Sequence, residues 1–283
     1  MPRGETMYRL AIAFLAAGLF VCGIAPPAQA QLAEGWTPVP FPGRPDATFR
    51  ARVAAPAAPA GKLAAVVVAH GSGGIDGRAN AYVVALRDAG IATLEIEMFA
   101  SGGRPDRLQA TYPHVLGALA FLAANPAIDP ARIGLMGFSW GGGLGLAMAQ
   151  EGNYPPGSTL RYAALMPFYP VCNPSLRNGV GALTGRPVLI LAGGRDDYDA
   201  SDDCPRLAAM MNTRTPGAVD VHVYPDATHI WDTTRREPFN FYDRFAMRGA
   251  GGQVRVVPDA ATKADSVART VSFFAAKLGT APR

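Results

Sequence analysis

A serine stands between glycines where a strand-like run gives way to a helix-like one. Residues 137–141 read Gly-Phe-Ser-Trp-Gly, and two more glycines follow. On a sharp strand-to-helix turn, flanking glycines let neighbouring backbone approach closely and present the hydroxyl of Ser139 at the sheet edge. This arrangement suits a nucleophile. The five-residue pattern is weak alone because it occurs often by chance, so its partners must be found.

A serine nucleophile needs a base, an acid that orients the base, and donors that hold an oxyanion. The chain contains four histidines. His70 belongs to a glycine-rich turn, His114 to a predicted helix and His222 to a predicted strand, so we expect these three to be structural. His229 follows the last predicted strand on a polar loop, where a general base would lie. We therefore predict that His229 is the base.

The acid is expected after the preceding strand, where Asp196, Asp197 and Asp199 crowd into one short loop. Spacing alone does not select one of them. An aspartate three residues beyond the first glycine is placed to reach a histidine on the next loop. This favours Asp196, with Asp197 second and Asp199 third. Asp226 lies so near His229 in the chain that we expect it only to shape the turn.

Two backbone N–H groups would stabilise the oxyanion. One belongs to Trp140, which directly follows the serine. The second is expected from the turn at 70–74, His-Gly-Ser-Gly-Gly, with Ser72 as donor and Gly73 as the alternative. In isolation these glycines could simply make a tight loop, but a loop alone does not explain the whole set of features in chain order.

The elements that must position these residues alternate between strand and helix. Buried strands are predicted at 63–69, 91–96, 133–137, 162–166, 187–192 and 219–224. Helices are predicted at 81–89, at 108–124, from about 140, and at 261–278, after a proline-rich lead-in at 36–45. This alternation predicts an α/β fold whose mostly parallel sheet has helices on both faces. The carboxyl ends of such strands share one edge, where the serine, acid and histidine would meet.

The first thirty residues are predicted to lie outside the fold. Arg3 and Arg9 precede an apolar stretch at 10–24, and a small-x-small pattern ends at Ala30. This is the layout of a signal peptide, which predicts cleavage near Ala30 and export to the periplasm or the extracellular space. The apolar stretch is short for a membrane anchor. Met7 could equally be the true start.

The remaining residues, 31–283, suit a single domain. A formal net charge of +4 is too weak and too scattered to indicate nucleic acid. We expect no membrane span in the mature protein and no cofactor or metal. Cys172 and Cys204 remain after cleavage, and an even pair in an exported protein predicts one disulfide, with two free thiols as the alternative.

Together these residues resemble the dienelactone hydrolase family of the α/β-hydrolase superfamily. The resemblance runs from about residue 60 to 278 and is carried by residues 70–74, 129–142, 168–172 and 192–197, with Cys204 and His229. It implies an α/β-hydrolase fold and a triad of Ser139, Asp196 and His229. The founding members have a cysteine nucleophile. Ser139 and the export signal therefore favour ester hydrolysis in general over the lactone of that family.

The function that this resemblance and these residues favour is an exported serine hydrolase of small-molecule carboxylic esters or lactones, acting through an acyl-enzyme. A serine peptidase or amidase of the same superfamily would use the same triad. A non-catalytic binding protein on this scaffold is the third hypothesis, and the intact set of triad residues argues against it. The sequence indicates neither the substrate nor the oligomeric state.

Several aromatic residues fall on loops at the predicted carboxyl edge of the sheet. Phe99, Trp140, Tyr198 and Trp231 could line an apolar substrate pocket, or they could pack the loops against the sheet. The sequence favours neither interpretation. The long segment 238–252, which contains Arg244 and Arg248, could cover the site.

Overall fold

The computed structural model describes residues 1, 34–57, 61–99, 103–246 and 252–279. The predicted signal peptide and its cleavage site lie outside these ranges. Within them, the central sheet has eight strands: β1 (Gly35–Phe41), β2 (Arg44–Ala54), β3 (Leu63–Ala69), β4 (Ala92–Ile96), β5 (Ile128–Phe138), β6 (Ala164–Phe168), β7 (Val188–Gly193) and β8 (Val219–Tyr224).

The spatial order of the strands is β1-β2-β4-β3-β5-β6-β7-β8. Strand β2 runs antiparallel to both β1 and β4, whereas the pairings from β4 through β3 to β8 are all parallel. This confirms the predicted mostly parallel sheet. The carboxyl ends of β3, β5, β7 and β8 consequently meet at one edge.

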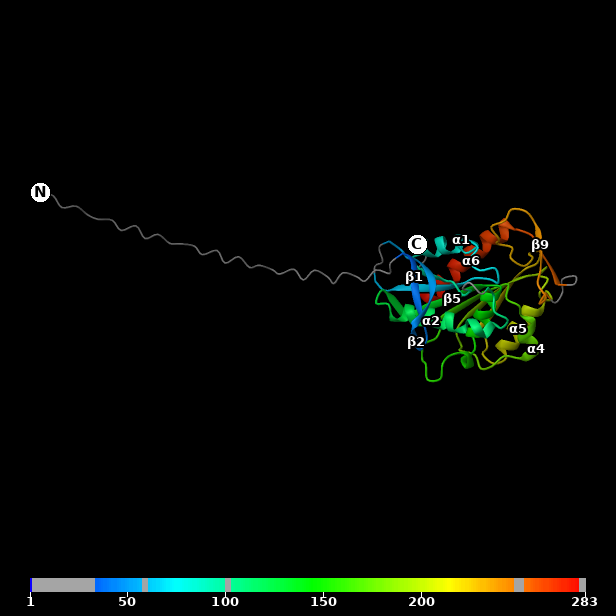
Figure 1. The fold of residues 1–283 in the computed structure, drawn as a ribbon, viewed down its shortest axis with the longest axis horizontal. Helices are drawn as coiled ribbons and strands as arrows, with labels where there is room; N and C mark the ends of the chain where they lie inside the picture. Colours follow the sequence, from blue (N-terminus) through cyan, green and yellow to red (C-terminus); the bar gives the residue numbers. More distant parts are fainter. Residues whose placement is uncertain (2–33, 58–60, 100–102, 247–251, 280–283) are drawn as a thin grey trace.

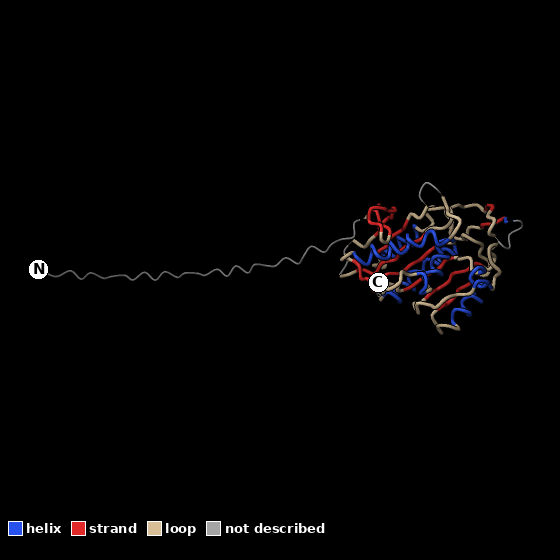
Figure 2. Tube along the Cα trace, turned by 60° about the horizontal axis from the view of Figure 1, so that its bottom comes forward, coloured by secondary structure: helices blue, strands red, loops and turns tan. Residues whose placement is uncertain are grey.

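Helices cover both faces of this sheet. They are α1 (Asn80–Asp88), α2 (Tyr112–Ala124), α3 (Trp140–Met148), α4 (Asn173–Asn178), α5 (Asp203–Asn212) and α6 (Ala260–Leu278), with 3-10 turns η1 (Leu108–Thr111) and η2 (Glu151–Asn153). Helices α1 and α6 pack on one face, and α2, α3 and α5 pack on the other (Figure 1). Figure 2 shows the strands as a layer between the helices.

Strand β3 shows how the sequence builds two cores. All seven of its residues are buried. Leu63, Ala65, Val67 and Ala69 face the core under α2 and α3, while the residues between them face the core under α1 and α6. Because side chains alternate along a strand, an uninterrupted apolar run is required where both faces are covered.

The sheet also contains a hairpin that the sequence analysis does not predict. Residues 36–45, expected to be a lead-in, instead form most of β1 and its turn into β2. Pro38 and Pro40 make this segment look unlike a strand, because proline is rare in β-strands. They are tolerated because β1 is an edge strand, bonded on one side only.

A second, two-stranded sheet lies beyond β8. It pairs β9 (Phe239–Tyr242) with β10 (Gln253–Val256) in antiparallel fashion. Strand β9 lies in segment 238–252, which the sequence analysis considers as a cover for the site, and β10 follows that segment directly. Among the described residues, no helix combines the length and apolarity needed to cross a bilayer.

Candidate active site

Ser139 occupies a strained turn between β5 and α3. Its φ of 52° lies in the left-handed region that non-glycine residues rarely adopt. The glycines on either side are required by close backbone packing. A Cβ on Gly137 would collide with the carbonyl of Gly141, and one on Gly141 would collide with the carbonyl of Ala69. The sequence thus fixes a turn that places the serine at the carboxyl edge of the sheet.

Ser139, His229 and Asp196 form one hydrogen-bonded chain. The Nε2 atom of His229 lies 2.8 Å from Ser139 Oγ, and its Nδ1 atom lies 2.7 Å from Asp196 Oδ2. An ionised carboxylate only accepts hydrogen bonds, so Nδ1 carries the ring proton and the Nε2 lone pair faces the serine hydroxyl. His229 is 1% exposed. This arrangement orients the imidazole to accept a proton from the serine.

The two alternative aspartates are engaged elsewhere. Asp197 accepts a hydrogen bond from the backbone N–H of Arg255 on β10, at 2.8 Å. Asp199 accepts from the backbone N–H groups of Cys172 and Asn173. Of the three carboxylates, Asp196 is therefore the one that contacts the histidine.

The loops that carry Asp196 and His229 are packed directly against each other. The N–H of Gly194 donates to the carbonyl of Tyr224 at 2.8 Å, and that of Arg195 to the carbonyl of Ala227 at 2.9 Å. A Cβ on Gly193 would lie 2.6 Å from the carbonyl oxygen of Ala227. Backbone contact between the two loops therefore fixes the separation of the acid from the histidine.

A buried polar network of Arg78, Tyr82, Tyr169 and Asp232 contacts His229 through the ring of Tyr169. The Tyr169 ring packs edge-on against His229, with 4.9 Å between ring centroids. The Tyr169 hydroxyl donates to Asp232 at 2.7 Å and accepts from Arg78 at 3.2 Å, and Tyr82 donates to the same aspartate. Burial raises the pKa of Asp232, while the nearby guanidinium and the two hydroxyls oppose this shift. Because its polar atoms are hydrogen-bonded, the network can hold the ring rigidly.

The glycine turn after β3 packs closely against Ser139. A Cβ on Gly71 would lie 3.6 Å from Ser139 Cβ. His70 holds this turn, since its Nδ1 atom donates to the Gly71 carbonyl and its Nε2 atom accepts from the N–H of Met98. Burial lowers the pKa of His70, which favours the neutral imidazole. In the described ranges, the N–H groups of Ser72 and Trp140 meet no acceptor.

The other two histidines lie away from the hydroxyl. His114 on α2 packs against Phe41 and Phe49, and burial lowers its pKa to about 4. His222 on β8 packs against the ring of Tyr224. Both are structural, in agreement with the sequence analysis.

Two cavities meet at Ser139. The larger, of about 710 Å³, is lined by His229 and by polar side chains that include Asp76, Arg78 and Arg235. The smaller, of about 530 Å³, is lined by apolar residues of α3, η1 and the start of α2 and by polar residues that include Gln109, Ser175 and Arg177. Both cavities contain Ser72, Arg104, Asp106, Ser139, Tyr198 and Asp243 in their walls.

Arg104 lines both cavities and connects three segments of the site. Its Nη1 atom donates to Ser72 Oγ at 3.1 Å and to Asp243 Oδ2 at 2.8 Å. The hydroxyl of Tyr198 donates to the same carboxylate oxygen at 2.9 Å. Burial opposes ionisation of Asp243, but these donors hold its pKa below the usual range. The glycine turn, the acid loop and the β9–β10 sheet are thereby tied together.

Sequence reasoning does not find Arg104 or Asp243. The sequence places Arg104 only in so far as it follows the predicted strand 91–96, which puts it near the carboxyl edge of the sheet. The described part of segment 238–252 lies against the site, since Phe239 and Asp243 line the larger cavity. Arg244 bonds Asp106, and Arg248 lies outside the described residues.

The aromatic pocket candidates divide into two groups. Tyr198 lines both cavities and Trp140 lines the smaller one. Trp231 is instead 1% exposed and packs between Tyr169 and Tyr224, so its assignment to the pocket is corrected to a packing role. Phe99 packs on His70 and Trp140 and is likewise absent from the residues that line these two cavities.

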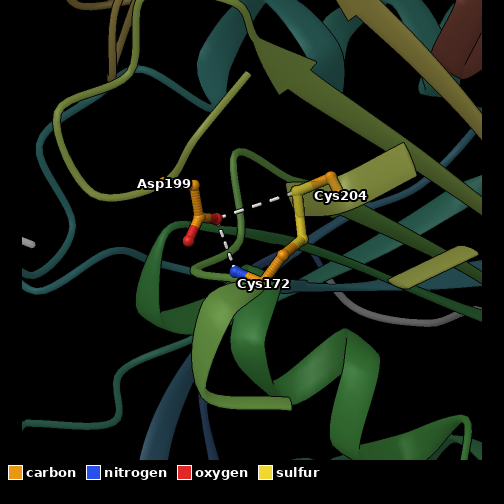
Figure 3. Close-up of side chains that lie close together, drawn as sticks. All are labelled: Cys172, Asp199 and Cys204. Atoms are coloured by element: carbon orange, nitrogen blue, oxygen red, sulfur yellow. Dashed lines mark hydrogen bonds between the residues drawn. A yellow bond between two sulfur atoms is a disulfide. The ribbon is translucent and has the colours of Figure 1, made fainter. Parts of the chain in front are cut away.

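The predicted disulfide between Cys172 and Cys204 is present (Figure 3). It ties the segment after β6 to the start of α5, and Asp199 lies beside it. Burial raises the pKa of Asp199 to about 6, against the effect of its two backbone donors. Among the described residues, these three form the one cluster with the spacing of metal ligands, and both of its sulfurs are committed to the disulfide.

Comparison with known proteins identifies the family and the fold. The sequence profile of the dienelactone hydrolase family matches residues 49–278. No curated protein sequence matches the chain. Among solved structures, the apo form of Thermogutta terrifontis esterase 2 superposes with a TM-score of 0.63 at 16% identity, covering 88% of this chain and 97% of that one.

Two further forms of the same esterase are similar to this chain. The form phosphorylated by paraoxon has a TM-score of 0.63 at 17% identity, with coverage of 88% and 96%. The propionate-bound form has a TM-score of 0.60 at 17% identity, with coverage of 84% and 93%. At these identities the likeness establishes the α/β-hydrolase fold.

Proposed function

The chain belongs to the dienelactone hydrolase family and is a hydrolase, and on that premise we propose that it cleaves carboxylic esters through an acyl-enzyme on Ser139. The observation that carries this proposal is the hydrogen-bonded chain from Asp196 through His229 to Ser139. The propionate bound to the structurally similar esterase, a small carboxylate like the acid product of ester cleavage, gives further support.

In the proposed reaction, His229 Nε2 takes the hydroxyl proton of Ser139 while Oγ attacks the ester carbonyl carbon. The carbonyl oxygen becomes an oxyanion, held by the free N–H groups of Trp140 and Ser72. Asp196 stabilises the imidazolium through its bond to Nδ1. When the intermediate collapses, the carbon–alkoxy bond breaks and the alcohol leaves with the proton from Nε2.

The second half of the reaction releases the acid. A water molecule gives its proton to His229 Nε2 and attacks the acyl carbon. The new oxyanion occupies the same pair of N–H donors. Its collapse breaks the bond to Oγ, and the imidazolium returns the proton to Ser139.

Hydrolysis of p-nitrophenyl butyrate tests the proposal. We expect Ser139→Ala to lower kcat by at least about 10³-fold while the protein stays folded, because the three residues act as a unit. Ser201→Ala is the matched control, since Ser201 is an exposed serine outside the site. A variant rate within tenfold of the parent would remove Ser139 from the mechanism. The corresponding p-nitroanilide tests the amidase alternative with the same acyl group.

We also propose that the protein is exported and that residues 1–30 are removed. The support is the N-terminal sequence pattern together with a buried disulfide, which persists in oxidising compartments. N-terminal sequencing of the protein from the periplasm or medium of a producing cell checks this. The first residue is expected to be Gln31, and an intact N-terminus would contradict removal.

A further inference from the structure

The two cavities differ in their relation to the proton donor. Ser139 lines both of them, whereas His229 lines the larger one and not the smaller. An acyl carbon attached to Ser139 Oγ carries two further groups besides the oxyanion, namely the rest of the acid and the leaving alcohol. The two cavities are placed to receive one group each.

The proton transfer from His229 determines which cavity receives the leaving alcohol and which receives the rest of the acid. The leaving alkoxide must take its proton from His229 Nε2, so it must lie on the side where the imidazole is accessible. That side is the larger, more polar cavity. The rest of the acid is then directed into the smaller cavity.

The smaller cavity is a groove along one face of α3. Trp140, Gly143, Leu146 and Ala147 line it, at the three- and four-residue spacing of a single helix face, and Gln150 lines it just beyond the end of α3. A rise of 1.5 Å per residue makes the helical part of this line, from Trp140 to Ala147, about 10 Å long. The groove starts beside Ser139 and is long enough for an extended hydrocarbon chain.

The opposite wall of the groove combines apolar residues with the polar residues Gln109, Ser175 and Asn178. Leu108 and Tyr112 close it from η1 and α2, and Val171 and Pro174 close it from the start of α4. Gly143 marks its narrow point, since a Cβ there would lie 3.3 Å from the Leu108 side chain. An apolar chain would gain burial here, whereas a charged or strongly hydrated one would lose its hydration.

The larger cavity has a higher share of polar surface. Its walls carry Asp76, Arg78, Thr233, Thr234 and Arg235, which present charges of both signs together with hydroxyl groups. Such a surface offers hydrogen-bond donors and acceptors beside His229. Ile230, Phe239 and Phe241 add apolar area, so the two cavities differ in the proportion of polar surface. The larger cavity suits a small hydroxylated alcohol better than a hydrocarbon chain.

We propose that the substrates are esters of a medium-length aliphatic acid with a small polar alcohol, the acid in the α3 groove and the alcohol on the His229 side. This assignment rests on the proposed ester hydrolysis. Each methylene buried in the groove contributes up to about a fourfold increase in kcat/KM. The rate should therefore rise from acetate through butyrate to octanoate esters.

A pair of esters with the chain on opposite sides provides the first test. Methyl octanoate places the long chain in the acid, and octyl acetate places it in the alcohol. We expect the first to have at least tenfold higher kcat/KM. A tenfold preference for octyl acetate, or equal rates, would overturn the assignment. If p-nitrophenyl acetate is not hydrolysed either, the proposed ester hydrolysis itself fails, which keeps the two outcomes distinct.

Groove variants provide the second test. Gly143→Leu fills the groove about 6 Å along α3 from Ser139, and Ala147→Leu fills it about 12 Å along. Gly143→Leu should therefore lower the rate on p-nitrophenyl butyrate and octanoate, and Ala147→Leu on octanoate alone, each at least tenfold. Ser175→Leu, from the facing wall, replaces either variant if it does not fold. The control is Ala209→Leu, at an exposed position of α5.

The pattern across substrates decides the outcome. A selective loss of the longer esters, with p-nitrophenyl acetate unchanged, supports the groove as the acyl site. An equal loss on acetate and octanoate, or no loss on octanoate, would overturn it.

Discussion

Breaking the disulfide should destabilise the fold far more than it impairs the chemistry. Cys172 and Cys204 are 32 residues apart in the chain. For a loop of that length, the chain-entropy relation gives a loss of about 3.7 kcal/mol in the free energy of unfolding at 25 °C. In a protein of this size each kcal/mol corresponds to about 2–4 °C, so the melting temperature should fall by about 7–15 °C.

Guanidinium unfolding with and without dithiothreitol measures the effect. The parent protein should lose the calculated stability on reduction, and the double variant Cys172→Ala, Cys204→Ala should not respond to the reductant. Equal stability of the oxidised and reduced parent, within about 0.5 kcal/mol, would refute the entropic reasoning.

The kcat at 25 °C should stay within about twofold of the oxidised parent, since the backbone bonds of Gly194 and Arg195, not the disulfide, hold Asp196. A collapse of kcat in folded, reduced protein would show instead that the disulfide positions the acid.

Two predictions concern neighbouring aspartates. Asp196→Asn should lower kcat by about 10³- to 10⁴-fold because it disturbs the imidazole tautomer. Asp197→Asn should leave kcat within about twofold of the parent. Steady-state kinetics of both variants on the same ester measures the difference. Burial raises the pKa of Asp199 to about 6. Between about pH 4 and 6 the native state therefore holds a proton that the unfolded chain releases, and stability falls by about 3 kcal/mol as the pH rises through this window. Urea unfolding at pH 4.5 and 7 should show about 2 kcal/mol of this loss in the parent and not in Asp199→Asn. An equal loss in both proteins would exclude Asp199 as its source.

The parallel part of the fold is predictable because its strands are buried on both faces. Such strands must be apolar throughout, and β3 occupies the range predicted from that pattern. Strand β8 also occupies its predicted range, although it is an edge strand that contains Asp220 and His222. The β1–β2 hairpin is different, since β1 is an edge strand whose proline and polar residues resemble those of a loop. The β9–β10 pair is missed for a related reason, because its alternating pattern spans only four residues in each strand.

The candidate site is predictable where its signals are local. Ser139 is marked by its own turn, and His229 can be chosen by elimination among four histidines. No local sequence pattern of this kind identifies Arg104. Its partners Ser72 and Asp243 lie 32 and 139 residues away in the chain, and nothing in the sequence indicates which side chains the folded loops bring together.

The close packing of the acid and histidine loops has a consequence for mutational scanning. No side chain fits at Gly193 or Gly194, since each would collide with the backbone of the loop that carries His229. A scan scored on activity alone would place these glycines beside Ser139 as if they took part in the reaction. Scoring cellular abundance in parallel separates them, because a glycine variant loses the folded protein, while Ser139→Ala loses only the turnover.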